Sequence, residues 1–97
     1  MFEIEFTASA LEDLRQYKKG EQSLILDRIE SQRKAEPLVE TRNRKPLRPN
    51  DLSQWEVRIE KFRVFYDVNA EENIVTIKAL GHKEHNTLFI RGQEFEL

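Results

Sequence analysis

Three stretches of the chain alternate apolar and polar residues with a period of two, which is typical of half-buried strands. The first is FEIEF, Phe2 to Phe6. The other two, WEVRIE (Trp55–Glu60) and RVFYDV (Arg63–Val68), flank a tight connection at Glu60–Phe62. This pattern predicts one N-terminal strand and a later hairpin with one apolar face.

Two amphipathic helices are predicted between these strands. The first begins after Thr7 or Ser9, and Lys18, Lys19 and a left-handed Gly20 are expected to end it. The second runs from about Glu21 to Ala35. Its apolar stripe consists of Leu24, Ile25 and Ile29. Since the turn between the helices is very short, they should form an antiparallel hairpin.

The rest of the chain supplies a long loop and further strands. Leu38–Gln54 lacks a sustained period and is expected to be an ordered loop, anchored by Leu47 and Leu52. A central strand is predicted at Ile74–Leu80, ended by Gly81, and the last segment is expected to be an edge strand or a partly mobile tail.

The predicted fold is therefore α+β, with the order β-α-α-β-β-β and a helical hairpin packed on one face of a mostly antiparallel twisted sheet. Residues 1–97 form a single domain, since a chain of 97 residues is too short for two cores. The sheet face away from the helices, here called the outer face, should carry the polar-phase residues of the hairpin. They are Glu56, Arg58, Glu60, Arg63 and Phe65.

Charge is distributed unevenly along the chain. The formal net charge is −2, but Arg33–Arg48 contains six cations and two acids, a net +4. The remaining 10 cations and 16 acids sum to −6. A basic patch on an acidic body is compatible with a polyanion bound at one face, and equally with a solvated loop. The candidates for contact with nucleic acid are Arg42, Arg44, Lys45, Arg48, Lys61 and Phe65.

Several classes of chemistry have no motif in this chain. It has no phosphate-binding loop, dinucleotide fingerprint or HExxH, and the absence of cysteine removes thiolate chemistry and fits a reducing, cytoplasmic location. We expect no cofactor and no metal, since His82 and His85 would need further ligands. A membrane partner is not expected either, because no apolar run approaches the ~20 residues of a membrane span.

The order of these elements, followed by WEVRIEKFRVFYDV and LGHKEH, resembles the RelE/ParE superfamily of bacterial type II toxin-antitoxin toxins. The resemblance covers about residues 2–90 and is most specific from the hairpin to GHK. It implies a cognate antitoxin as partner. It also implies one of two activities, cleavage of ribosome-bound messenger RNA as in RelE-like members, or inhibition of DNA gyrase as in ParE-like members.

The resemblance assigns roles residue by residue for a metal-independent endoribonuclease (an mRNA interferase). Arg63 would stabilise the phosphorane, Lys83 would act as a second charge clamp, and Arg58 occupies a basic position on the neighbouring strand. Glu56 and Phe89 depart from the family pattern, which often has a lysine and a tyrosine there. His85, with Glu56 as base or orienting group, would then replace the missing groups.

Three functions remain open from the sequence: a RelE-like nuclease, a ParE-like gyrase inhibitor, and a catalytically weak or inactive member. Without the resemblance, Arg58 and Arg63 would be read as partners of Glu56, Glu60 or Asp67 in cross-strand ion pairs, which stabilise an exposed sheet by only ~0.2–1 kcal/mol.

Overall fold

The computed structural model describes residues 2–31, 37–38 and 40–96. The elements follow one another as β1 (Glu3–Phe6), α1 (Ala8–Arg15), α2 (Lys19–Ser31), β2 (Arg44–Pro46), β3 (Trp55–Ile59), β4 (Phe62–Asn69), β5 (Ile74–Glu84), β6 (Thr87–Ile90) and β7 (Gln93–Phe95). No helix in the described part of the chain has both the length and the apolar character that crossing a bilayer requires.

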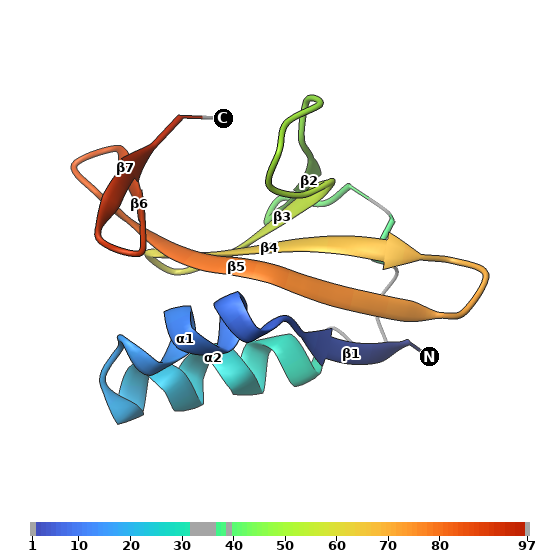
Figure 1. The fold of residues 1–97 in the computed structure, drawn as a ribbon, viewed down its shortest axis with the longest axis horizontal. Coiled ribbons are helices and arrows are strands. Elements are labelled where there is room, and N and C mark those ends of the chain that lie inside the picture. The colour runs from blue at the N-terminus through green and yellow to red at the C-terminus, as the bar shows by residue number, and fades with distance from the viewer. Residues whose placement is uncertain (1, 32–36, 39, 97) are drawn as a thin grey trace.

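The seven strands of the described residues belong to one sheet. Its order is β2-β3-β4-β5-β6-β7, and β1 pairs with the first half of β5. The β1–β5 pair is parallel, whereas all other pairs are antiparallel. The two helices lie side by side beneath the sheet, and β2 and the β6–β7 hairpin rise on the opposite side (Figure 1). The predicted fold class is confirmed, and β2, β6 and β7 are additional to the predicted order β-α-α-β-β-β.

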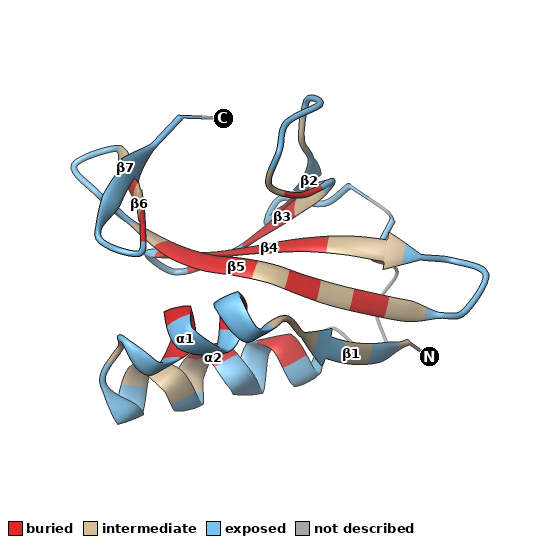
Figure 2. Cartoon of the chain, viewed as in Figure 1, coloured by how far each residue is buried: buried red, intermediate tan, exposed pale blue. Residues whose placement is uncertain are grey.

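The main core lies between the helices and the sheet. The alternating positions Val57, Ile59, Val64 and Tyr66 pack there with Ile25 and Ile29 of α2. This alternation continues along the first half of β5, where buried and half-buried residues follow one another (Figure 2). Thr7 caps α1, since its side-chain oxygen accepts a hydrogen bond from the Ala10 N–H at 3.1 Å.

A second, smaller core lies on the outer face. Phe65, Ala79, Leu88 and Ile90 are buried together, and Leu47 and Leu52 pack against them as the sequence predicted. Strand β6 and the loop after β2 therefore cover part of the face that alternation alone leaves open to solvent. This cover leaves a groove, described below.

Some predicted boundaries are wrong. Gly20 does not end a helix in the left-handed region, because α1 already ends at Arg15 and Gly20 lies inside α2. Gly81 does not end its strand, because β5 continues to Glu84 and pairs there with β6. The predicted end of the second helix, at Ala35, lies outside the described residues.

Candidate functional site

Strand register places the predicted cations on the outer face. Arg58 of β3 lies directly opposite Arg63 of β4, and Arg63 lies opposite Gly81 of β5. Lys83 follows two residues after Gly81 and therefore shares its face. Like charges directly opposite one another on paired strands destabilise a sheet, so the Arg58–Arg63 pair gains stability when an anion binds between them.

Arg63 is held in place without a carboxylate. Its side chain is buried, and Nη1 donates hydrogen bonds to the carbonyl oxygens of Glu60 and Phe62, both at 2.8 Å. Burial lowers the pKa of Arg63, the nearby Arg58 lowers it further, and Glu56 opposes both effects. Two backbone carbonyls thus orient the guanidinium of Arg63, which is 7% exposed.

The acids near these cations pair with other groups. Glu60 lies 3.7 Å from Arg28, Glu56 lies 3.7 Å from Lys45, and Asp67 accepts a hydrogen bond from the Gln54 N–H. Within residues 2–31, 37–38 and 40–96, no carboxylate forms an ion pair with Arg58, Arg63 or Lys83. The cross-strand ion pairs expected without the family resemblance are therefore not formed in the described structure.

A groove of about 300 Å³ opens on the outer face. Lys83 lines it, whereas Arg58 and Arg63 are not among its lining residues. Lys45 and Arg48 line it from β2 and the following loop, and Glu56 lines it from β3. Lys83, Asn86 and Leu88 contribute from β5, the turn after it and β6, and Phe95 from β7. Pro46 and Leu47 complete the lining. Among the lining residues, Asn86 and Phe95 were not singled out from the sequence, which predicted only an edge strand or a partly mobile tail around Phe95.

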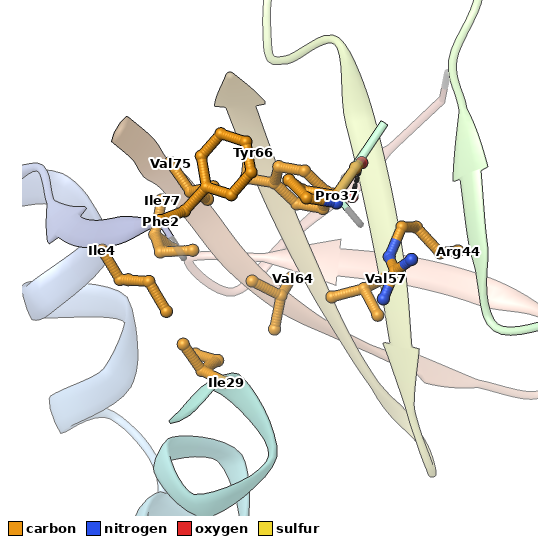
Figure 3. A pocket seen from close by; sticks show the side chains of 10 residues that line it. All are labelled: Phe2, Ile4, Ile29, Pro37, Arg44, Val57, Val64, Tyr66, Val75 and Ile77. Atoms are coloured by element: carbon orange, nitrogen blue, oxygen red, sulfur yellow. Dashed lines mark hydrogen bonds between the residues drawn. The ribbon is translucent and has the colours of Figure 1, made fainter. Parts of the chain in front are cut away.

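Three of the predicted nucleic-acid contacts lie elsewhere. Phe65 is fully buried, because β6 packs over it, so the prediction of an exposed aromatic is wrong. Arg44 is opposite Val57 and shares its helix-side face, where it lines an apolar pocket (Figure 3). Lys61 extends toward α2 and lies 3.2 Å from Glu21.

The remaining candidates lie at the surface. Arg42 is exposed in the turn before β2 and is not among the residues that line the groove, whereas Lys45 and Arg48 are. His85 is exposed in the β5–β6 turn with a left-handed backbone, at φ 50°. Arg33 and Lys34, part of the basic segment, lie outside the described residues.

The other histidine, His82, and both tyrosines lie on the helix side of the sheet. Tyr17 Oη lies 2.9 Å from His82 Nδ1, and His82 Nε2 lies 3.2 Å from Glu84. Burial raises the pKa of Tyr17 to about 12, and it also raises the pKa of Tyr66, whose hydroxyl donates to the Pro37 carbonyl. Phe89 stacks on His82, with ring centroids 5.6 Å apart, and therefore also points away from the groove.

The arrangement is suited to binding an anion rather than to holding a metal ion. Among the described residues, no group of three or more histidine, aspartate or glutamate side chains is placed to hold a metal ion. The outer face instead presents guanidinium and ammonium groups beside a buried carboxylate, Glu56. Such cations stabilise phosphate groups and the charge that develops when a phosphodiester reacts.

Comparisons with known proteins agree with this description. The family model described as "ParE toxin of type II toxin-antitoxin system, parDE" matches residues 4–87. No curated protein sequence matches the chain.

Solved structures with the same fold include two toxin-antitoxin complexes. One is the toxin-antitoxin complex RelBE2 from Mycobacterium tuberculosis, with a TM-score of 0.72, 24% identity, and coverage of 84% of this chain and 98% of that chain. The other is the archaeal RelE-RelB complex from Pyrococcus horikoshii OT3, with a TM-score of 0.68, 19% identity, and coverage of 87% and 97%.

Proposed function

Because the chain belongs to the ParE toxin family, within the RelE/ParE superfamily of type II toxin-antitoxin toxins, we propose that it is an endoribonuclease toxin that cleaves ribosome-bound messenger RNA. The observation that carries this proposal is the placement of Arg58, Arg63 and Lys83 on one face without carboxylate partners among the described residues. A ribosomal target also requires the cytoplasmic location that the sequence predicts.

The cations would act on the scissile phosphate. In metal-independent cleavage the RNA 2′-hydroxyl attacks the adjacent phosphorus, and negative charge accumulates on the phosphorane oxygens. Arg63, oriented by the Glu60 and Phe62 carbonyls, would stabilise that charge together with Lys83. Arg58 would bind the same or the neighbouring phosphate from the opposite strand.

Proton transfer would depend on His85 and Glu56. Glu56 lies in the groove and can accept the 2′-hydroxyl proton, while the exposed His85 can protonate the leaving 5′-oxygen. Neither Tyr17 nor Tyr66 can take these roles, since both hydroxyls are bonded on the helix side. Loss of one positioned acid or base typically slows a reaction ~10²–10⁴-fold, so we expect this range for His85→Ala.

Cleavage is tested with purified protein added to a stalled ribosome that carries message and an empty A site. Primer extension should show new 5′ ends with the wild type and far fewer with Arg63→Ala. Arg15→Ala is the control, because Arg15 pairs with Glu12 at 2.8 Å on the exposed surface of α1. An intact message, in cells whose growth the protein still arrests, would exclude nuclease action.

Inhibition of DNA gyrase is the second candidate function. It is favoured by the carboxylate of Glu56 in the groove and by the orientation of Phe89 away from it. A supercoiling assay with purified gyrase separates the two: an inhibitor blocks supercoiling and leaves RNA intact. If neither assay responds and overexpression is harmless, the chain is an inactive member.

We further propose an antitoxin partner, since the RelBE2 and archaeal RelE-RelB structures are complexes of a toxin with an antitoxin. Its segment would cover the outer face or the helical hairpin and place acidic side chains against the cations. Co-expression with the product of the adjacent gene should yield a stable complex and restore growth. Independent purification of the two proteins, with toxicity unchanged, would contradict this.

A further inference from the structure

The outer face has an exposed aromatic ring, although not at the position that the sequence indicated. Phe65 is fully buried, whereas Phe95 of the edge strand β7 remains 38% exposed. Phe95 lies opposite Leu88 of β6 in the antiparallel register, so both side chains point to the same face. It is also the one aromatic residue among those that line the groove.

The surroundings of Phe95 combine an apolar ring with separate polar groups. Lys83 and Asn86 line the groove from the end of β5 and the following turn, and Lys45 and Arg48 line it from β2 and the loop after it. Glu56 is the one acid of the lining, and Lys45 at 3.7 Å offsets its charge. Arg48 and Lys83 form no ion pair within the part of the chain that the structure describes.

We propose that Phe95, Lys83, Asn86 and Arg48 form a subsite for one nucleotide of single-stranded RNA. The base stacks on the Phe95 ring, Lys83 and Arg48 bind the flanking phosphates, and the Asn86 amide contacts the base edge. An acidic peptide could pair its carboxylates with Lys83 and Arg48, but it has no nucleotide base to stack on the Phe95 ring. The groove therefore fits RNA better than an acidic peptide. The subsite rests on the proposed nuclease function and extends it to substrate recognition.

Binding of a fluorescein-labelled single-stranded RNA octamer, followed by anisotropy, tests the subsite. The matched ligand is an octamer of the same length whose nucleotides lack bases. Stacking of a base on an aromatic ring tolerates any sequence and typically raises affinity by a factor of about 5 to 150 per base. Phe95→Ala should therefore weaken binding of the normal octamer by that factor. Binding of the abasic octamer should not change, because its phosphates still meet Arg48 and Lys83.

Two further variants separate stacking from the packing of β7. Phe95→Leu keeps an apolar side chain and should lose affinity as Phe95→Ala does, whereas Phe95→Trp should retain it. Leu26→Ala on α2 is the control, since Leu26 is similarly exposed, at 41%, and lies away from the groove. Thermal unfolding of each variant shows whether β7 remains in place.

Each outcome decides a different question. If Phe95→Ala weakens both octamers equally, or neither, the subsite is wrong while RNA binding stands. If Phe95→Leu binds as tightly as the wild type, apolar packing explains the site and stacking is excluded. If the wild type binds no RNA, the proposed nuclease fails with its subsite. If only an acidic peptide competes for the groove, that peptide and not RNA is its ligand.

Discussion

At Gly81, strand β5 passes so close to β6 that no side chain fits between them. A Cβ atom at this position would lie 2.6 Å from the Phe89 carbonyl oxygen and 2.8 Å from Ile90 Cγ1. We expect Gly81→Ala to move β6 and to destabilise the protein by ~1–3 kcal/mol, the typical cost of overpacking. Urea denaturation measures this.

Gly20→Ala is the matched control for Gly81→Ala. Nothing lies within 4 Å of a Cβ atom at Gly20, which is inside α2. Because Gly20 is the second residue of α2 rather than in its middle, alanine should be tolerated without loss of stability. An unchanged denaturation midpoint for Gly81→Ala would show that β6 can move to accommodate the Cβ atom without loss of stability.

The burial of the Asp13 carboxylate makes the stability of the protein depend on pH. Its carboxylate is buried, accepts the Leu80 N–H at 3.1 Å and lies 2.9 Å from Arg91 Nε. Burial raises its pKa above the ordinary 3.8, and the bonds to Leu80 and Arg91 oppose this only in part. The stability that Asp13 contributes is therefore complete below pH 3.8 and declines as pH rises through the higher folded-state pKa.

Asp13→Asn tests this, because the amide cannot titrate. The free energy of unfolding of the variant should increase relative to that of the wild type as pH rises above 3.8. Denaturation curves at a series of pH values measure the difference. A relative change in the opposite direction would mean that the Arg91 ion pair outweighs burial.

Among the elements, the loop between β2 and β3 owes its order to Asn50. The Asn50 side chain donates to the carbonyls of Arg48 and Ser53 and accepts from the N–H groups of Leu52 and Ser53. Asn50→Ala removes all four hydrogen bonds, and at a net ~0.5–1.5 kcal/mol for a typical bond the loop should lose much of its order. We expect RNA affinity to fall several-fold, since this loop carries Arg48.

Two comparisons sharpen the Asn50 prediction. Asn50→Asp keeps both acceptor bonds and should bind RNA with intermediate affinity. Asn69→Ala breaks a single turn bond, from the Glu72 N–H, outside the residues that line the groove, and should leave RNA affinity unchanged. Anisotropy titration measures all three, and equal affinities would show that the loop needs no side-chain support.

At the scale of the whole molecule, the acidic body and the cationic outer face make RNA binding depend on salt. Each phosphate contact to a single strand contributes about 0.7 to the slope of log affinity against log salt concentration. Lys83→Ala should reduce the slope by about that amount. Lys19→Ala, at the start of α2 on the helix side, should not alter it. Equal slopes for the two variants would contradict an RNA site on the outer face.

The sequence alone determined the strands and helices that alternation and helical periodicity encode, because both patterns depend on local geometry. It also assigned Arg58, Arg63 and Phe65 to one face correctly, since the phase of a strand follows from its own residues. It did not predict β2, because three residues are too few to show a period. It therefore could not tell that Arg44 lies on the helix side of the sheet and Lys45 on the outer face.

Only the tertiary structure decided what covers the outer face. The packing of β6 over Gly81 buries Phe65, exposes Phe95 in the groove and turns Phe89 toward His82. These outcomes depend on contacts between segments far apart in the chain. Period-two alternation tells which side of a strand a residue occupies, but burial depends on which other strand or loop packs against that side.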